Sequence, residues 1–151
     1  MEQANFWKNK KVLVTGHTGF KGSWLSLWLY TLKSKVFGYS LEPPTKKNLY
    51  KIANIKKIVT KEKIANINNY NNLKKFIDSN KIEIIFHLAA QSLVRRSYEN
   101  PFQTIKSNTM GTASILECIR NCNSVKTAII VTTDKVYKNT KVKNFYKETD
   151  S

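Results

Sequence analysis

Residues 11–22 read KVLVTGHTGFKG, and this stretch decides which fold the chain adopts. Its first five residues form a short β-branched run of the kind found in a buried strand. Three of the chain's 5 glycines follow, at Gly16, Gly19 and Gly22, before a helical pattern begins. Gly16 allows a tight turn, Gly19 lets a pyrophosphate approach the backbone, and Gly22 lets the helix pack closely on the sheet. The spacing therefore predicts a dinucleotide-binding loop at a helix N-terminus.

The rest of the chain alternates strand patterns with helix patterns. Strands are predicted, in chain order, at 11–15, 36–39, about 58–59, 82–88 and 125–132. Helices are predicted at 19–33, 48–53, 70–80 and 102–121. Strands joined by crossing helices form a parallel sheet with helices on both faces. The predicted fold class is therefore α/β, a doubly wound parallel sheet of the Rossmann type.

Composition narrows the class of protein. The chain has 151 residues, which fits one domain, and its 41% hydrophobic residues exclude a disordered chain. No apolar run reaches the roughly 18 residues that a membrane span needs. Two cysteines, Cys118 and Cys122, are too few for a disulfide scaffold or a zinc site. We therefore expect no metal, no membrane partner and a reducing compartment, the cytoplasm.

The net charge of +16 raises the question of nucleic-acid binding. The basic residues are 23 Lys and only 3 Arg, whereas readers of base edges favour the bidentate fork of Arg. The lysines are scattered along the chain beside 16 Asn, which indicates a compositional bias. We expect no nucleic-acid partner, although a basic chain attracts an anionic ligand such as a nucleotide.

Strings at the predicted strand ends carry a more specific signal. TGHTGFKGSW at 15–24 follows the first strand, LAAQSLVRRSY at 88–98 the fourth, and TDK at 133–135 the fifth. Together they resemble the extended short-chain dehydrogenase/reductase family and, within it, the CDP-glucose 4,6-dehydratases. The resemblance runs from about Phe6 to Tyr137.

That resemblance implies an enzyme with bound NAD as cofactor and a nucleotide sugar as substrate. In the family, NAD takes a hydride from C4 of the glucose, water leaves across C5–C6, and the hydride returns to C6. The implied catalytic residues are Thr133, which holds the C4 oxygen, Asp134, which protonates the C6 leaving group, and Lys135, which takes the C5 proton. Three alternatives stay open: a polar loop without catalytic function at 133–135, another NAD-dependent nucleotide-sugar dehydratase or epimerase, and a non-catalytic dinucleotide-binding fragment.

The resemblance also implies a set of binding residues. Those for the cofactor are Gly16, Thr18, Gly19, Phe20, Gly22, Ser40, Asn66, Ile67, Leu88, Ala89, Ala90 and Asn108. Those for the substrate are Gln91 and Arg96, although Arg96 is equally well explained as a solvated side chain. NAD enzymes usually carry an acidic residue near position 40, which binds the adenosine ribose. Ser40 can bind a ribose hydroxyl but would not repel the 2′-phosphate of NADP. The sequence therefore favours NAD without excluding NADP. Asn66 stands where the family often has an adenine-binding Asp.

The two histidines receive different predictions. His87 lies in an apolar strand and is expected to be a core histidine. His17 lies in the glycine loop, where a side-chain contact to phosphate stays open.

The family's Tyr-x-x-x-Lys pair does not occur at its expected place, on a helix after the fifth strand. Tyr70–Lys74 and Tyr137–Lys141 have the spacing, but both come too early in the chain. We therefore expect residues 1–151 to be an incomplete NAD-binding domain, without its last helix and strands or the substrate-binding region.

Such a chain should be inactive by itself. Ile129 and Val131 in the fifth strand should be partly exposed, and the full-length protein should be a homodimer.

Overall fold

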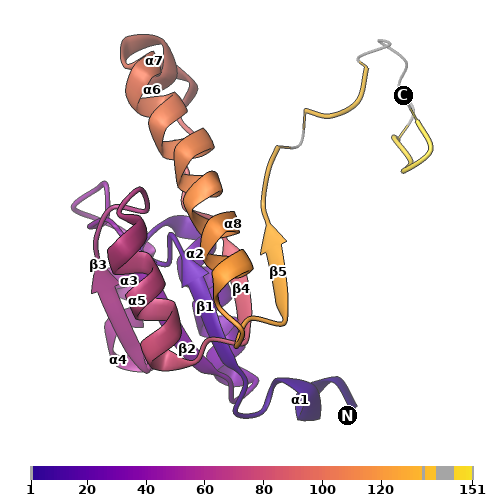
Figure 1. Ribbon diagram of the computed structural model, residues 1–151. Helices are drawn as coiled ribbons and strands as arrows, with labels where there is room; N and C mark the ends of the chain where they lie inside the picture. The colour runs from indigo at the N-terminus through magenta and orange to yellow at the C-terminus, as the bar shows by residue number, and fades with distance from the viewer. Residues whose placement is uncertain (1, 134, 139–144, 151) are drawn as a thin grey trace.

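The computed structural model describes residues 2–133, 135–138 and 145–150. A five-stranded sheet forms its centre, with all strands parallel and in the order β3-β2-β1-β4-β5 (Figure 1). The strands are β1 (Lys11–Thr15), β2 (Lys35–Ser40), β3 (Lys61–Ile64), β4 (Ile84–His87) and β5 (Thr127–Ile130). This order confirms the predicted doubly wound α/β fold, because the chain starts in the middle and extends the sheet first to one side and then to the other.

Nine helical segments connect or flank these strands in the described ranges. They are α1 (Glu2–Trp7), α2 (Phe20–Thr31), α3 (Leu49–Ile52), α4 (Ile55–Ile58), α5 (Tyr70–Asn80), α6 (Val94–Glu99), α7 (Pro101–Ile105), the π-helix η1 (Lys106–Met110) and α8 (Gly111–Asn121). Asn48 and Asn69 cap α3 and α5 by accepting a hydrogen bond from a first-turn backbone N–H.

Two apolar cores lie on opposite faces of the sheet. Alternate residues of β1 divide between them, since Val12 and Val14 face one core and Leu13 the other. Helices α2 to α4 cover the first core, where Leu29 and Ile55 pack on β1 and β2. Helices α5 and α8 cover the second core. Strand β1 is therefore buried on both sides, which its apolar run requires.

One predicted strand is wrong. Ile58 and Val59 were expected to form it, but Ile58 ends α4 and the strand begins only at Lys61. Strand β3 has the sequence KEKI and pairs with β2 at the edge of the sheet. An edge strand needs no apolar run, because only one of its sides is paired and its faces are half open. The predicted helix at 102–121 is likewise divided by η1, and the sequence patterns did not indicate α1, α4 or α6.

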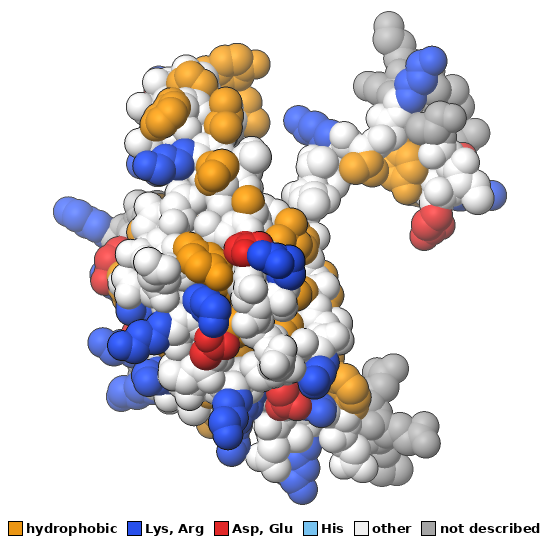
Figure 2. All heavy atoms as spheres, in the orientation of Figure 1, with side chains coloured by type: hydrophobic (Ala, Val, Ile, Leu, Met, Phe, Trp, Pro, Cys, Tyr) orange, Lys and Arg blue, Asp and Glu red, His pale blue; other side chains and the backbone are white. Residues whose placement is uncertain are grey.

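The segment from α6 to α8 extends beyond the carboxyl ends of the strands, with α6 and α7 at its far end (Figure 1). Figure 2 shows hydrophobic side chains gathered at that far end. The exposed large apolar residues of this segment include Val94, Tyr98, Phe102 and Ile105, and the preceding Leu93 is exposed as well. At β5, Ile129 is 39% and Val131 47% exposed, which confirms the expected exposure of these two side chains. Across the described ranges, no helix is both long and apolar enough to cross a membrane.

Candidate functional site

The three glycines of the loop have different surroundings. Gly16 has φ +75°, and a Cβ there would lie 2.9 Å from Ala89 N. A Cβ on Gly22 would lie 2.1 Å from Gly16 O. A Cβ on Gly19, by contrast, would meet one atom within 4 Å, Gly16 O at 3.3 Å. Gly16 and Gly22 are therefore required by the fold itself, whereas Gly19 leaves open space above the loop for a ligand.

That open space lies at the start of α2. Gly19 is the N-cap residue, has extended backbone and provides no side-chain hydrogen bond to the first turn. The first turn contains no acidic residue, so its backbone N–H groups and the positive end of the helix dipole face an incoming anion without competition. Phe20 is exposed beside them. The residues present fit a dinucleotide pyrophosphate.

At the end of β2 the loop is fastened by two hydroxyl groups. Thr18 Oγ1 donates to Leu41 O at 2.8 Å, and Thr18 Oγ1 lies 2.8 Å from Ser40 Oγ. Since the carbonyl can only accept, Ser40 is the donor in the second bond and keeps its acceptor lone pairs. Ser40 can therefore accept a hydrogen bond from a ribose hydroxyl.

His17 does not face the ligand space. Its side chain is fully buried under β2, with Nε2 2.8 Å from Glu62 Oε2, and a Cβ on Gly38 would lie 2.5 Å from its ring. Burial lowers the pKa of His17, and the contact with Glu62 opposes that shift. Glu62 also accepts from Tyr50 Oη at 2.9 Å, and burial raises the pKa of that phenol. A contact between His17 and phosphate is therefore ruled out; its ring supports the loop from below.

The end of β4 is connected to the α6–α8 segment through Asn108. Asn108 Oδ1 accepts from Gln91 N at 2.7 Å, and Asn108 Nδ2 donates to Gln91 O at 3.0 Å. The side-chain amide of Gln91 forms hydrogen bonds with Leu93 and Thr104. Gln91 is thus brought to the carboxyl edge, but its side chain already has partners.

The other predicted binding residues lie around the same edge. Asn66 is exposed, and its Oδ1 accepts from Asn68 N at 2.9 Å, which leaves a second lone pair. Ile67 is buried beneath Gly111, where an added Cβ would lie 2.6 Å from Ile67 Cγ2. Arg96 is exposed on α6.

Of the predicted catalytic triplet, Thr133 and Lys135 are exposed beyond β5. Lys135 N donates to Thr133 Oγ1 at 3.1 Å, which is the turn geometry expected of a Thr that follows a strand. Asp134 lies outside the described residues. In the described part, no group of three or more His, Cys, Asp or Glu side chains is placed to hold a metal ion.

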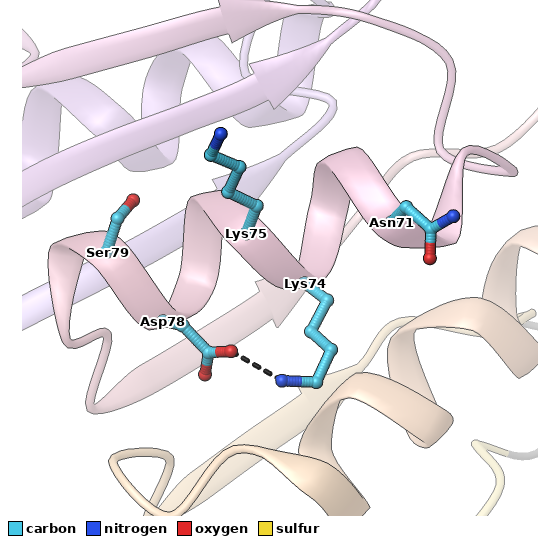
Figure 3. A pocket seen from close by; sticks show the side chains of 5 residues that line it. All are labelled: Asn71, Lys74, Lys75, Asp78 and Ser79. Atoms are coloured by element: carbon cyan, nitrogen blue, oxygen red, sulfur yellow. Dashed lines mark hydrogen bonds and ion pairs between the residues drawn. The ribbon is translucent and has the colours of Figure 1, made fainter.

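A surface depression on α5 is unrelated to this edge. Asn71, Lys74, Lys75, Asp78 and Ser79 line it, and all five come from one helix (Figure 3). Lys74 and Asp78 form an i,i+4 ion pair across it. Such an exposed pair contributes little to stability, and the depression offers no converging groups for a reaction.

Comparison with known proteins places this geometry in context. A family model described as GDP-mannose 4,6 dehydratase matches residues 13–151. CDP-glucose 4,6-dehydratase of Salmonella typhimurium is 45% identical over 139 residues, which cover 92% of this chain and 38% of that protein. dTDP-D-glucose 4,6-dehydratase of Dictyostelium discoideum is 33% identical over 135 residues, covering 85% of this chain and 30% of that protein. The chain thus spans less than half the length of these relatives.

A solved structure shares the fold. UDP-glucose-4-epimerase from Stenotrophomonas maltophila, with bound NAD and formylated UDP-arabinopyranose, superposes with a TM-score of 0.79 and 23% identity. The superposition covers 95% of this chain and 42% of the epimerase.

Proposed function

Because the chain belongs to the GDP-mannose 4,6-dehydratase family, we propose that it binds NAD and forms the cofactor site of a nucleotide-sugar 4,6-dehydratase acting on CDP-glucose. The NAD bound to the Stenotrophomonas epimerase, which shares the fold, supports NAD as the cofactor. The observation that carries the proposal is the open space above Gly19 at the uncapped start of α2, in a chain whose match to the family covers residues 13–151. The 45% identity to the Salmonella enzyme supports CDP-glucose over other nucleotide sugars.

Each binding or catalytic residue has a proposed role that follows from its place in the fold. The N–H groups at the start of α2 hold the pyrophosphate, and Ser40 accepts from the adenosine ribose. Asn66, Ile67, Leu88, Ala89 and Ala90 line the cofactor, and Gln91 and Arg96 contact the substrate. NAD, when bound, accepts a hydride from the sugar and returns it. Thr133 holds the C4 oxygen, Asp134 protonates the departing C6 hydroxyl, and Lys135 removes the C5 proton.

The cofactor proposal predicts that Gly19→Val abolishes NAD binding. A Val side chain fits the extended backbone at Gly19 and projects into the open space where the pyrophosphate is proposed to lie. Calorimetric titration of the parent chain and the variant with NAD measures the effect, with thermal unfolding as a check that the variant remains folded. Equal NAD affinity of the two chains would show that the loop is not the cofactor site.

The activity proposal is tested in a chimera, because the chain spans 38% of the Salmonella relative. Residues 1–151 replace the matching segment of that dehydratase, and release of a 4-keto-6-deoxy sugar from CDP-glucose is followed. We expect turnover with CDP-glucose, because residues 1–151 supply the proposed cofactor site and catalytic triplet, while the Salmonella enzyme supplies the substrate-binding region. Absence of turnover would contradict the proposal, and epimerised product would favour the second candidate, an epimerase.

In that chimera, Lys135→Met is expected to lower product release by about a hundredfold or more, the usual contribution of general base catalysis. The C4 oxidation step should survive, so reduced cofactor should accumulate and be visible as nicotinamide absorbance. Lys138→Met, three residues further on, is the matched control. Product release at the parental rate from Lys135→Met would place the base elsewhere.

The proposal also covers location and assembly. We place the protein in the cytoplasm, with a nucleotide sugar as its partner and neither nucleic acid nor membrane. The exposed apolar side chains of the α6–α8 segment support a homodimer for the complete enzyme.

A further inference from the structure

The second histidine, His87, lies at the centre of a buried chain of hydrogen bonds that no step of the proposed reaction uses. It is the last residue of β4 and is 2% exposed. Its Nδ1 lies 2.8 Å from Thr15 Oγ1 at the end of β1, and its Nε2 lies 3.2 Å from Thr112 Oγ1 on α8. One imidazole thus joins the central strand to the helix that covers it.

The partners of Thr15 fix which nitrogen of His87 carries the proton. Thr15 Oγ1 accepts from Leu88 N at 3.1 Å and from Ala89 N at 3.2 Å, which uses both of its lone pairs. Its single hydroxyl proton is therefore directed to His87 Nδ1, which must be bare. The proton of a neutral ring is then on Nε2 and is donated to Thr112 Oγ1.

At Thr112 the hydrogen bonds run in the same direction, from Thr15 through His87 towards Asn108. Thr112 Oγ1 donates to Asn108 O at 2.7 Å, and that carbonyl lies in the π-turn η1. The hydroxyl protons of Thr15 and Thr112 and the Nε2 proton of His87 thus each have one acceptor, whereas a charged ring would leave its Nδ1 proton without one. Burial lowers the pKa of His87 to about 4, in agreement with a neutral ring.

The two ends of this series of hydrogen bonds contact two parts of the candidate site. Thr15 holds Leu88 and Ala89 directly under Gly16, where an added Cβ would lie 2.9 Å from Ala89 N. Asn108, at the other end, binds both backbone groups of Gln91. Displacement of the ring would release both contacts at the carboxyl edge.

We propose that His87, as the neutral Nε2–H tautomer, is a positioning residue that aligns the floor of the glycine loop with the π-turn carrying Asn108. It touches neither cofactor nor substrate and acts through Thr15 and Thr112. The expected effect on NAD affinity rests on the proposed function, whereas the tautomer and the rigidity of the two backbone segments do not.

The first test uses the unmodified chain labelled with 15N. Long-range proton–nitrogen correlation spectra at pH 7 assign the ring proton of His87. We expect it on Nε2, with Nδ1 showing the shift of an unprotonated nitrogen. A proton on Nδ1, or a charged ring, overturns the proposal whether or not the chain binds NAD.

The second test separates the two arms of the ring with two variants. In His87→Asn, Oδ1 replaces Nδ1 as the acceptor for Thr15, and the Thr112 arm is lost. In His87→Gln, Nε2 replaces the donor to Thr112, and the Thr15 arm is lost. Amide hydrogen exchange should rise mainly at Gln91 in the Asn variant, and mainly at Leu88 and Ala89 in the Gln variant.

NAD affinity should follow the Thr15 arm. We expect the Gln variant to bind NAD about tenfold more weakly than the parent, the equivalent of one lost hydrogen bond, and the Asn variant to stay within about threefold. Exchange unchanged in both variants, or raised equally at both places, overturns the positioning role. If the unmodified chain does not bind NAD, the proposed function fails, while the tautomer and the exchange pattern still decide this proposal.

Discussion

Gly22→Ala is expected to destabilise the chain by more than about 3 kcal/mol, a large part of the roughly 5–15 kcal/mol by which a typical domain is stable. The added Cβ would lie 2.1 Å from Gly16 O, 2.7 Å from Gly16 C and 2.8 Å from His17 Cα. All three are backbone atoms, so no flexible side chain can yield. Relief requires α2 to move away from β1. Urea unfolding followed by circular dichroism measures the loss.

Gly19→Ala is the matched control, three residues earlier in the same loop. Its Cβ would meet Gly16 O at 3.3 Å, a contact that a small shift relieves. We expect its free energy of unfolding to stay within about 1 kcal/mol of the parent value. Equal stability of Gly22→Ala and Gly19→Ala would contradict the close packing of α2 on the loop.

The second large effect is a loss of stability between pH 7 and pH 5. The pKa of His87 is about 4 in the folded chain and 6.5 as its ordinary value. Between these values the unfolded chain binds a proton that the folded chain does not, so the free energy of unfolding falls as the pH falls. The expected loss from His87 is about 2 kcal/mol over this range. His17, whose pKa burial also lowers, acts in the same direction.

Urea unfolding at pH 7 and pH 5 measures this change. The lower limit of pH 5 keeps the measurement above the range in which Glu83 and Glu117, whose pKa values are lowered by hydrogen bonds, become protonated. His87→Asn removes the titrating group and should reduce the pH dependence by about half or more. A parent chain with the same stability at both pH values would mean that burial does not lower the pKa of His87, because its ring reaches water in the folded state.

How far the sequence predicts the fold depends on what each element buries. Strands β1 and β4 are buried on both faces, so their apolar runs identified them directly. Strand β3 is defined by its pairing, Gly38 with Glu62 and Ser40 with Ile64, and its own composition is mostly charged. The apolar pattern therefore predicts the strand at Ile58 and Val59, whereas Ile58 ends α4 and Val59 is its C-cap residue.

The candidate site divides in the same way. Spacing along the chain located the glycine loop, because Gly16, Gly19 and Gly22 act within seven residues. The partners of the histidines are distant: Glu62 lies 45 residues from His17, and Thr15 lies 72 residues from His87. No local pattern contains such pairs, so Tyr50, Glu62, Thr15 and Thr112 were not predicted. Gly38 inside a strand pattern was the one available signal, because a glycine within a strand often marks the close approach of another group, here the His17 ring.

The π-helix η1 (Lys106–Met110) restricts the number of residues that the chain can have at this place. Such a turn contains one residue more than α-helical spacing allows, and each residue of an α-helix advances the rotation by about 100°. Deleting one residue here would leave a continuous helix whose first part, α7, is turned by that angle relative to α8. Gly111 would stay seated on Ile67, while Asn108 would swing away from Gln91. Helical phase therefore fixes the number of residues between α7 and α8, and gaps in an alignment of this family are expected in the loop at 41–47 rather than here.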